Sequence, residues 1–165
     1  MLRLSKLTDY AVVVLVRLAQ ADAALAHAGQ VAGMQTSPGI AAATGIPEPT
    51  VAKVLKILTG GGLVASQRGA RGGYRLLRPL GSIPIADVIA AIDGPIALTA
   101  CVEGSTGGCE SKSLCPVRGR WDPVNTAIRE ALSAITLADM QRASIPRAFR
   151  IPAEVIAAHT LAAAE

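Results

Sequence analysis

Aromatic side chains are scarce in this chain of 165 residues: they make up 2% and are Tyr10, Tyr74, Trp121 and Phe149. Rings spread so widely cannot form a platform for stacked bases, which disfavours a reader of single-stranded nucleic acid. Long apolar runs are also missing. The longest, residues 10–16, lies between Asp9 and Arg17 and falls far short of the ~20 residues of a membrane span. It also fits a signal peptide poorly. We therefore expect a soluble, cytoplasmic protein without a membrane partner.

Cysteine is limited to Cys101, Cys109 and Cys115, three residues within a stretch of fifteen. An odd number of cysteines without an export signal argues against a disulfide framework. Seven and five residues separate them, which is wider than the two to four residues between paired zinc ligands. A glycine-rich loop can instead wrap thiolates around an iron–sulfur cluster, which commonly has four ligands. Spacing alone leaves a cluster, a zinc site with a fourth ligand of another type, and ligand-free thiols all open.

Acidic residues are few in the first half of the chain. Residues 1–80 carry nine Lys/Arg against three Asp/Glu, whereas residues 81–165 carry seven against nine. The net charge of +4 therefore hides a basic first half and a mildly acidic second half. This asymmetry is typical of a polyanion-binding module joined to a second region. With 51% hydrophobic residues, the chain is apolar enough to fold.

Apolar periodicity and turn residues predict the local structure. The expected elements, in order, are helix 4–21, loop 22–35, helix 39–44, helix 49–59, strand-like runs 63–66 and 74–77, helix 83–92, loop 99–115 and helix 117–138. Ser37 is expected to cap the second helix, with Pro38 at its first position. Pro123 should kink the last helix or restart it. The order indicates a mainly α fold with a small β-hairpin wing, that is, a winged helix-turn-helix followed by a long C-terminal helix.

Three regions follow from this order. Residues 1–80 form the winged helix-turn-helix, residues 81–140 hold the cysteine loop and the long helix, and residues 141–165 are an Ala-rich tail of doubtful order. His27 and His159 are expected in a loop and in the tail, without a base-bearing motif near the thiols. We therefore expect neither an enzyme nor a small-molecule substrate.

Basic and hydroxyl side chains mark the predicted DNA-binding face. Thr50, Lys53 and Lys56 lie opposite the Val/Leu stripe of the third helix, where they could reach a major groove, although exposed helical lysines commonly serve only solubility. No acidic residue occurs between Gly62 and Pro79, a range that carries the wing arginines Arg68, Arg71, Arg75 and Arg78. A glycine-rich arginine tip fits a narrow minor groove. Ser5, with Lys6 and Thr8, is a further candidate for phosphate contact at a helix start.

Three segments carry a family resemblance. They are the run Leu2-Arg3-Leu4-Ser5-Lys6-Leu7-Thr8-Asp9-Tyr10-Ala11-Val12, the wing from Gly62 to Tyr74 with its Arg68-Gly69 and Gly72-Gly73 pairs, and Ile135-Thr136-Leu137-Ala138-Asp139. Together they resemble the Rrf-type winged-helix regulators, which include the iron–sulfur cluster regulator, the nitrite-sensitive repressor and the rhizobial iron regulator. The resemblance covers about residues 1–140, and the start of the chain looks most like regulators of the Suf assembly operon.

The resemblance implies a homodimer on palindromic double-stranded operator DNA, with long C-terminal helices that cross. It also implies a [2Fe–2S] or [4Fe–4S] cluster held by Cys101, Cys109 and Cys115. Some members add a histidine three residues after the last cysteine, but Arg118 stands there and cannot ligate. Others use an acidic residue of the partner's first helix, and Asp9 occupies that place, where an ordinary helix-start aspartate would also be favoured. The cluster regulator has a glutamate in its recognition helix where this chain has Ala52.

The resulting hypothesis is a regulator, most simply a repressor of iron–sulfur assembly genes, that senses cluster, iron or redox status. A nitric-oxide or thiol-redox sensor of the same fold without a stable cluster is the main alternative. Two functions of other classes also stay open: a small metalloenzyme at the thiols, and an interaction protein whose basic hairpin binds acidic partners.

Overall fold

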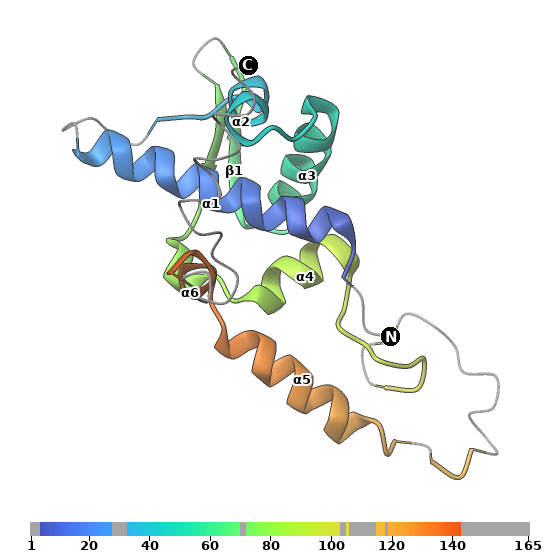
Figure 1. The fold of residues 1–165 in the computed structure, drawn as a ribbon. Helices are drawn as coiled ribbons and strands as arrows, with labels where there is room; N and C mark the ends of the chain where they lie inside the picture. The colour runs from blue at the N-terminus through green and yellow to red at the C-terminus, as the bar shows by residue number, and fades with distance from the viewer. Residues whose placement is uncertain are drawn as a thin grey trace, which may run out of the picture.

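The computed structural model describes residues 4–27, 33–69, 72–102, 105, 115–117 and 119–142. Their elements, in chain order, are α1 (Lys6–His27), α2 (Ser37–Thr44), α3 (Glu48–Gly60), β1 (Val64–Gln67), β2 (Gly73–Leu76), the 3-10 turn η1 (Leu80–Ser82), α4 (Ile85–Asp93), α5 (Asp122–Ala134) and α6 (Leu137–Arg142). In Figure 1, α1 crosses the middle of the molecule, with α2, α3 and the hairpin on one side and α4 and α6 on the other. Within the described residues, no helix is both long and apolar enough to cross a bilayer.

An apolar core joins α1, α3 and α4. Leu15 of α1, Leu58 of α3 and Val88 of α4 are each 0% exposed and belong to the same buried cluster. Full burial of one such side chain is worth roughly 1.5–3 kcal/mol. Because the Val/Leu stripe of α3 is wholly used in this core, the opposite face of α3 remains free for a partner.

The turn between α2 and α3 is built by local caps. The N-cap of α2 is Thr36, whose Oγ1 accepts a hydrogen bond from the backbone N–H of Gly39 over 3.2 Å. The prediction that Ser37 is the cap was wrong by one residue, because Ser37 is already helical. Gly45 ends α2 with φ +71°, a left-handed conformation that suits glycine. The helix expected over 49–59 is confirmed as α3.

The predicted hairpin is confirmed, with each strand displaced by one residue. β1 and β2 are antiparallel, with Val64 opposite Leu76 and Gln67 opposite Gly73. Gln35 pairs with Tyr74 through two backbone hydrogen bonds of 2.8 and 2.9 Å, so the segment before α2 borders β2. At the tip, a Cβ on Gly72 would lie 2.3 Å from the carbonyl oxygen of Gln67. The tip therefore requires glycine at that position.

The first helix is longer than predicted. A loop was expected from Asp22 onward, but α1 continues to His27. Alanines at positions 23 and 24 account for the difference, because alanine has the highest intrinsic helix propensity. α1 also packs against β2. The first helix thus supports the wing as well as the core.

The single helix expected over 117–138 is also not what forms. α5 starts at Asp122 with Pro123 in its first turn, so the proline restarts a helix rather than kinking one. At the other end the chain turns extended at Ile135. The backbone N–H of Ile85 donates to the Ile135 carbonyl over 2.9 Å, and that of Leu137 donates to the Ile83 carbonyl over 3.0 Å. This pairing also explains why α4 begins at Ile85 rather than at residue 83.

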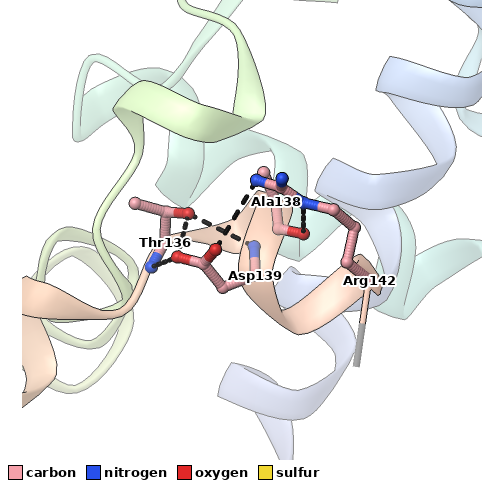
Figure 2. A network of polar contacts seen from close by, with 4 residues as sticks. All are labelled: Thr136, Ala138, Asp139 and Arg142. Carbon is pink, nitrogen blue, oxygen red and sulfur yellow. Dashed lines mark hydrogen bonds and ion pairs between the residues drawn. The ribbon is translucent and has the colours of Figure 1, made fainter. Parts of the chain in front are cut away.

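A new helix, α6, begins directly after this extended link. Figure 2 shows Thr136 and Asp139 exchanging hydrogen bonds at its start: Thr136 Oγ1 donates to Asp139 Oδ2 over 2.6 Å, and the Asp139 N–H donates to Thr136 Oγ1 over 3.2 Å. Leu137 is 0% exposed. The reciprocal cap and the burial of Leu137 together favour two helices over one. α5 consequently extends away from the body of the molecule (Figure 1).

Candidate nucleic-acid interface and cysteine segment

The outward face of α3 carries the predicted base-reading residues. Lys53 and Lys56 are exposed and Thr50 is half-buried. All three stand opposite Val51, Val54, Leu55 and Leu58, which the core covers. Ala52 is exposed beside them, so its position can also reach a partner. The core therefore holds α3 as a rigid support for a basic surface.

A groove of about 540 Å³ lies between α3 and the wing. Its polar lining includes Lys56 and Thr59 from α3, Ser66 and Arg68 from the wing, and Thr36 and Tyr74. Two cations and several hydroxyl groups at one groove suit phosphate oxygens. The structure thus brings Lys56 and Arg68 to one groove, as the DNA-binding prediction requires. Tyr74 and Thr36 were missed as lining residues because their placement depends on the pairing of Gln35 with β2.

The other predicted arginines are placed differently. Successive strand residues point to opposite faces, so Arg75 faces away from its neighbour Tyr74, which lines the groove. Burial raises the pKa of Asp22 on α1, and the positive charge of Arg75 partly opposes that rise. The charge of Arg75 therefore lies near α1. Arg71 lies outside the described residues.

Arg78 has a structural partner that the wing sequence did not reveal. Its Nη2 donates to Asp87 Oδ2 over 2.8 Å, and its Nη1 donates to the Ser82 carbonyl over 3.2 Å. The absence of acidic residues between Gly62 and Pro79 suggested a free cation, but the acid comes from α4. Arg78 thus joins the end of the wing to α4.

Ser5 lies at the start of α1, against the end of α4. Its backbone N–H donates to Asp93 Oδ2 over 3.2 Å, and its Oγ lies 3.3 Å from Thr8 Oγ1. Thr8 is 3% exposed and donates to the same Asp93 oxygen over 2.7 Å. Burial raises the pKa of Asp93, but hydrogen bonds from Ser5 and Thr8 outweigh that effect and leave the pKa below its ordinary value. The sequence predicts only that Asp93 ends a helix, and no local signal indicates a contact across 85 residues.

The cysteine segment, residues 94–115, follows Asp93 directly. Cys101 and Cys115 are free, half-buried thiols, and Cys101 Sγ lies 3.1 Å from Thr99 Oγ1. Cys109 lies outside the described residues. Asp9 is exposed in the first turn of α1. Among the described residues, no three His, Cys, Asp or Glu side chains are grouped to hold a metal. Free thiols in one segment are nevertheless the ligand type that iron–sulfur clusters use.

Asn125 of α5 holds the early part of this segment. Its Oδ1 accepts from the Leu98 N–H over 3.0 Å, and its Nδ2 donates to the Ile96 carbonyl over 3.1 Å. Asn125 is 3% exposed, so both contacts are shielded from water. Asn125 lies four residues after Trp121 and three before Ile128, on the apolar side of the helix, and a polar residue at such a position is a signal that could have indicated this role.

The fold and the basic groove define a winged-helix DNA-binding protein. The chain belongs to the Rrf2 family, whose model, described as an iron-dependent transcriptional regulator, matches residues 4–143. The protein is therefore a helix-turn-helix transcriptional regulator and not an enzyme. Rv1287 of Mycobacterium tuberculosis strain H37Rv is 34% identical over 145 residues, which cover 88% of this chain and 84% of that protein.

Two solved structures have the same fold. CymR, the global cysteine regulator of B. subtilis, is 27% identical with a TM-score of 0.61, covering 85% of this chain and 96% of its own. The T. potens IscR is 26% identical with a TM-score of 0.57, covering 90% of this chain and 97% of its own. The predicted winged helix-turn-helix is thereby confirmed, and operator DNA follows as the partner of this family of regulators.

Proposed function

We propose that this Rrf2-family regulator controls iron–sulfur assembly genes, acting as a repressor, and senses cluster, iron or redox status through Cys101, Cys109 and Cys115. The observation that carries the proposal is the position of the cysteine segment. Its first residues are joined to α1 through Asp93 and to α5 through Asn125. A change at the thiols is therefore placed to act on both the DNA-binding region and the outer helix.

The DNA-binding surface comprises the outward face of α3 and the groove beside it. Thr50, Lys53 and Lys56 would contact the major groove, with Arg68 and Arg71 at the wing beside the backbone or the minor groove. Arg75 and Ser5 would contribute less to DNA binding. Arg75 lies near Asp22, and the backbone N–H of Ser5 donates to Asp93. A regulator that binds operator DNA would act in the cytoplasm. The N-terminal run from Leu2 to Val12, similar to Suf regulators, makes a Suf promoter the first operator to test.

A homodimer would cover exposed apolar side chains on and around α5. Val117, Trp121, Val124 and Ile135 are 42–45% exposed. Val124, Ile128 and Ala131 recur at steps of four and three residues within α5, and Trp121 and Ile135, which flank the helix, continue this spacing in the sequence. That spacing is the heptad pattern of helices that pair through a seam. A second copy offers the matching stripe, as a two-fold dimer requires.

An iron–sulfur cluster would take its thiolates from the three cysteines, supplying a redox-active and oxygen-sensitive centre when bound. Asp9 is the proposed fourth ligand, supplied by the partner protomer. Its exposure on α1 leaves the carboxylate accessible to a second chain.

The test is to purify the protein anaerobically and to record its visible absorbance, its iron and sulfide content and its affinity for a Suf promoter fragment. We expect a coloured protein whose operator affinity differs between the loaded and cluster-free forms. A colourless, iron-free protein after anaerobic reconstitution would overturn the cluster role. Asp9→Ala should make the cluster more labile, whereas an unchanged lifetime and spectrum would dismiss Asp9.

The second candidate is a nitric-oxide or thiol-redox regulator of the same fold without a stable cluster. It is favoured by the free, half-buried state of Cys101 and Cys115. Its distinguishing result is operator binding by metal-free protein that changes with thiol oxidation or nitrosylation. Binding that depends only on iron loading would remove this alternative.

A further inference from the structure

We infer that Asp93 is a positioning residue that transmits the state of the cysteine segment to the first turn of α1. This inference rests on the proposed sensing function and names the contact that would carry it. Asp93 is the last residue of α4, and the cysteine segment begins at the next residue, Gly94. The carboxylate thus stands at the junction of a core helix and the sensing region.

One oxygen atom makes both contacts to α1. Asp93 Oδ2 accepts from Thr8 Oγ1 over 2.7 Å and from the Ser5 N–H over 3.2 Å. The Thr8 N–H in turn donates to the Ser5 carbonyl over 3.0 Å and lies 3.3 Å from Ser5 Oγ. Ser5 and Thr8 therefore form one hydrogen-bonded unit with Asp93 at the start of α1. Because the acceptor is a carboxylate, these hydrogen bonds are stronger than those between neutral groups.

The start of the cysteine segment is held at a second point, by Asn125 of α5. Asn125 fixes Ile96 and Leu98 to α5, so residues 94–98 are a short bridge between two anchors. Cys101 lies three residues beyond Leu98, so a displacement of its thiol would act first on this bridge and its two anchors. A cavity of about 520 Å³ beside this bridge, lined by Ser5, Lys6, Asp93 and Leu98 among others, leaves room for such movement.

α1 can pass a displacement on to the DNA-binding surface. Leu15 and Leu18 of α1 are packed in the same core as Val54 and Leu58 of α3, and well-packed cores transmit strain. Asp9, the proposed ligand to the partner's cluster, lies one residue after Thr8. The Asp93 contact therefore links a protomer's own cysteine segment to the turn of α1 that carries Asp9, the proposed ligand to the partner's cluster.

The experiment measures hydrogen–deuterium exchange at the backbone amides of residues 6–10 in full-length protein, before and after alkylation of the cysteines with iodoacetamide. In the wild-type protein we expect alkylation to change this exchange severalfold. Asp93→Ala should accelerate exchange about tenfold and abolish the response to alkylation, and Thr8→Val should do the same. Asp93→Asn should restore both properties, because its amide oxygen can accept the same two hydrogen bonds.

Asp87→Ala is the matched control, since it removes a carboxylate from the same helix and breaks only the contact with Arg78. It should leave residues 6–10 unchanged, and the amides of Val54 and Leu58 serve as an internal reference for global unfolding. An Asp93→Ala protein that responds to alkylation like the wild type overturns the inference, as does a wild-type α1 that does not respond at all. The anaerobic spectrum separately decides the cluster proposal, because the alkylation assay needs no iron.

Discussion

Thr136 Oγ1 lies 2.6 Å from Asp139 Oδ2, and the same hydroxyl accepts the Asp139 N–H over 3.2 Å, so the two residues cap the start of α6 reciprocally. A third contact joins the Thr136 N–H to Asp139 Oδ2 over 3.0 Å. Arg142 lies on the next turn, where its Nε donates to the Ala138 carbonyl and its Nη2 lies 3.5 Å from Asp139 Oδ1 (Figure 2).

Removing the hydroxyl of Thr136 should destabilise α6. Thr136→Ala deletes an N-cap and is expected to lower the free energy of unfolding by about 1 kcal/mol. Urea denaturation of the purified protein measures the change. Gln141→Ala, at an exposed position of the same helix, is the matched control and should change stability far less. Equal effects of the two substitutions would contradict the capping role.

Asp139 should titrate at a lower pH than a free aspartate. Hydrogen bonds from the hydroxyl and N–H of Thr136, aided by Arg142, hold its pKa below the ordinary value of 3.8. Because the folded pKa is the lower one, the carboxylate stabilises the fold above pH 3.8 and loses that contribution as pH falls through the folded pKa. NMR titration of the Asp139 carboxyl measures the shift, and Thr136→Ala should move the pKa upward. A pKa unaffected by that substitution would rule out Thr136 as the cause of the shift.

Thr36 and its neighbour Ser37 should differ sharply in their effect on stability. Thr36→Ala removes the cap of α2 and is expected to cost about 1 kcal/mol. Ser37 Oγ is buried with no hydrogen-bond partner among the described residues, so Ser37→Ala should be neutral or slightly stabilising. Thermal unfolding of both variants tests the pair. A larger loss from Ser37→Ala would restore Ser37 as the cap.

DNA affinity should depend on the groove between α3 and the wing. Lys56→Ala and Arg68→Ala are each expected to weaken binding to duplex DNA about tenfold and to reduce the slope of log K against log salt by about 0.9. Arg78→Ala is the control, because Arg78 is paired with Asp87. Fluorescence anisotropy across a salt series provides the measurement. Unchanged slopes for Lys56 and Arg68 would place the interface elsewhere.

Oligomeric state should depend on the stripe along α5. Val124→Glu places a charge at a position whose side chain is 44% exposed, and it should convert dimers to monomers at micromolar concentration. Leu77→Glu changes a side chain that is 49% exposed but lies beyond β2, and it should leave the assembly unchanged. Sedimentation equilibrium distinguishes the two. A monomeric wild-type protein, or a dimeric Val124→Glu protein, would refute the proposed seam.

Local signals were enough to predict much of this fold. Gly45, the Pro47–Pro49 turn and the triple glycine at residues 60–62 placed the ends of α2 and α3 nearly where they lie. The Val/Leu stripe of α3 also indicated which face is exposed, and with it the placement of Lys53 and Lys56. Periodicity and turn residues act within a few positions, so a sequence reveals them directly.

Contacts between distant segments could not be predicted in this way. Arg78 donates to Asp87 on α4, and Tyr74 pairs with Gln35. Thr8 donates to Asp93, 85 residues further along the chain. The break at Ile135 had a local signal in the Thr136–Asp139 spacing, but the continuous apolar period of residues 117–138 concealed it. The extended link forms there because it pairs with residues 83–85, and periodicity carries no information on that pairing.

The pairing of Ile135 and Leu137 with residues 83–85 has a geometric consequence. Two backbone hydrogen bonds attach the C-terminal end of α5 to the core that also carries α3, so contacts within the chain constrain the angle between these helices. In a dimer joined through α5, that angle would determine how far apart the two α3 helices lie. The extended link would then determine the spacing between the operator half-sites that such a dimer can bind.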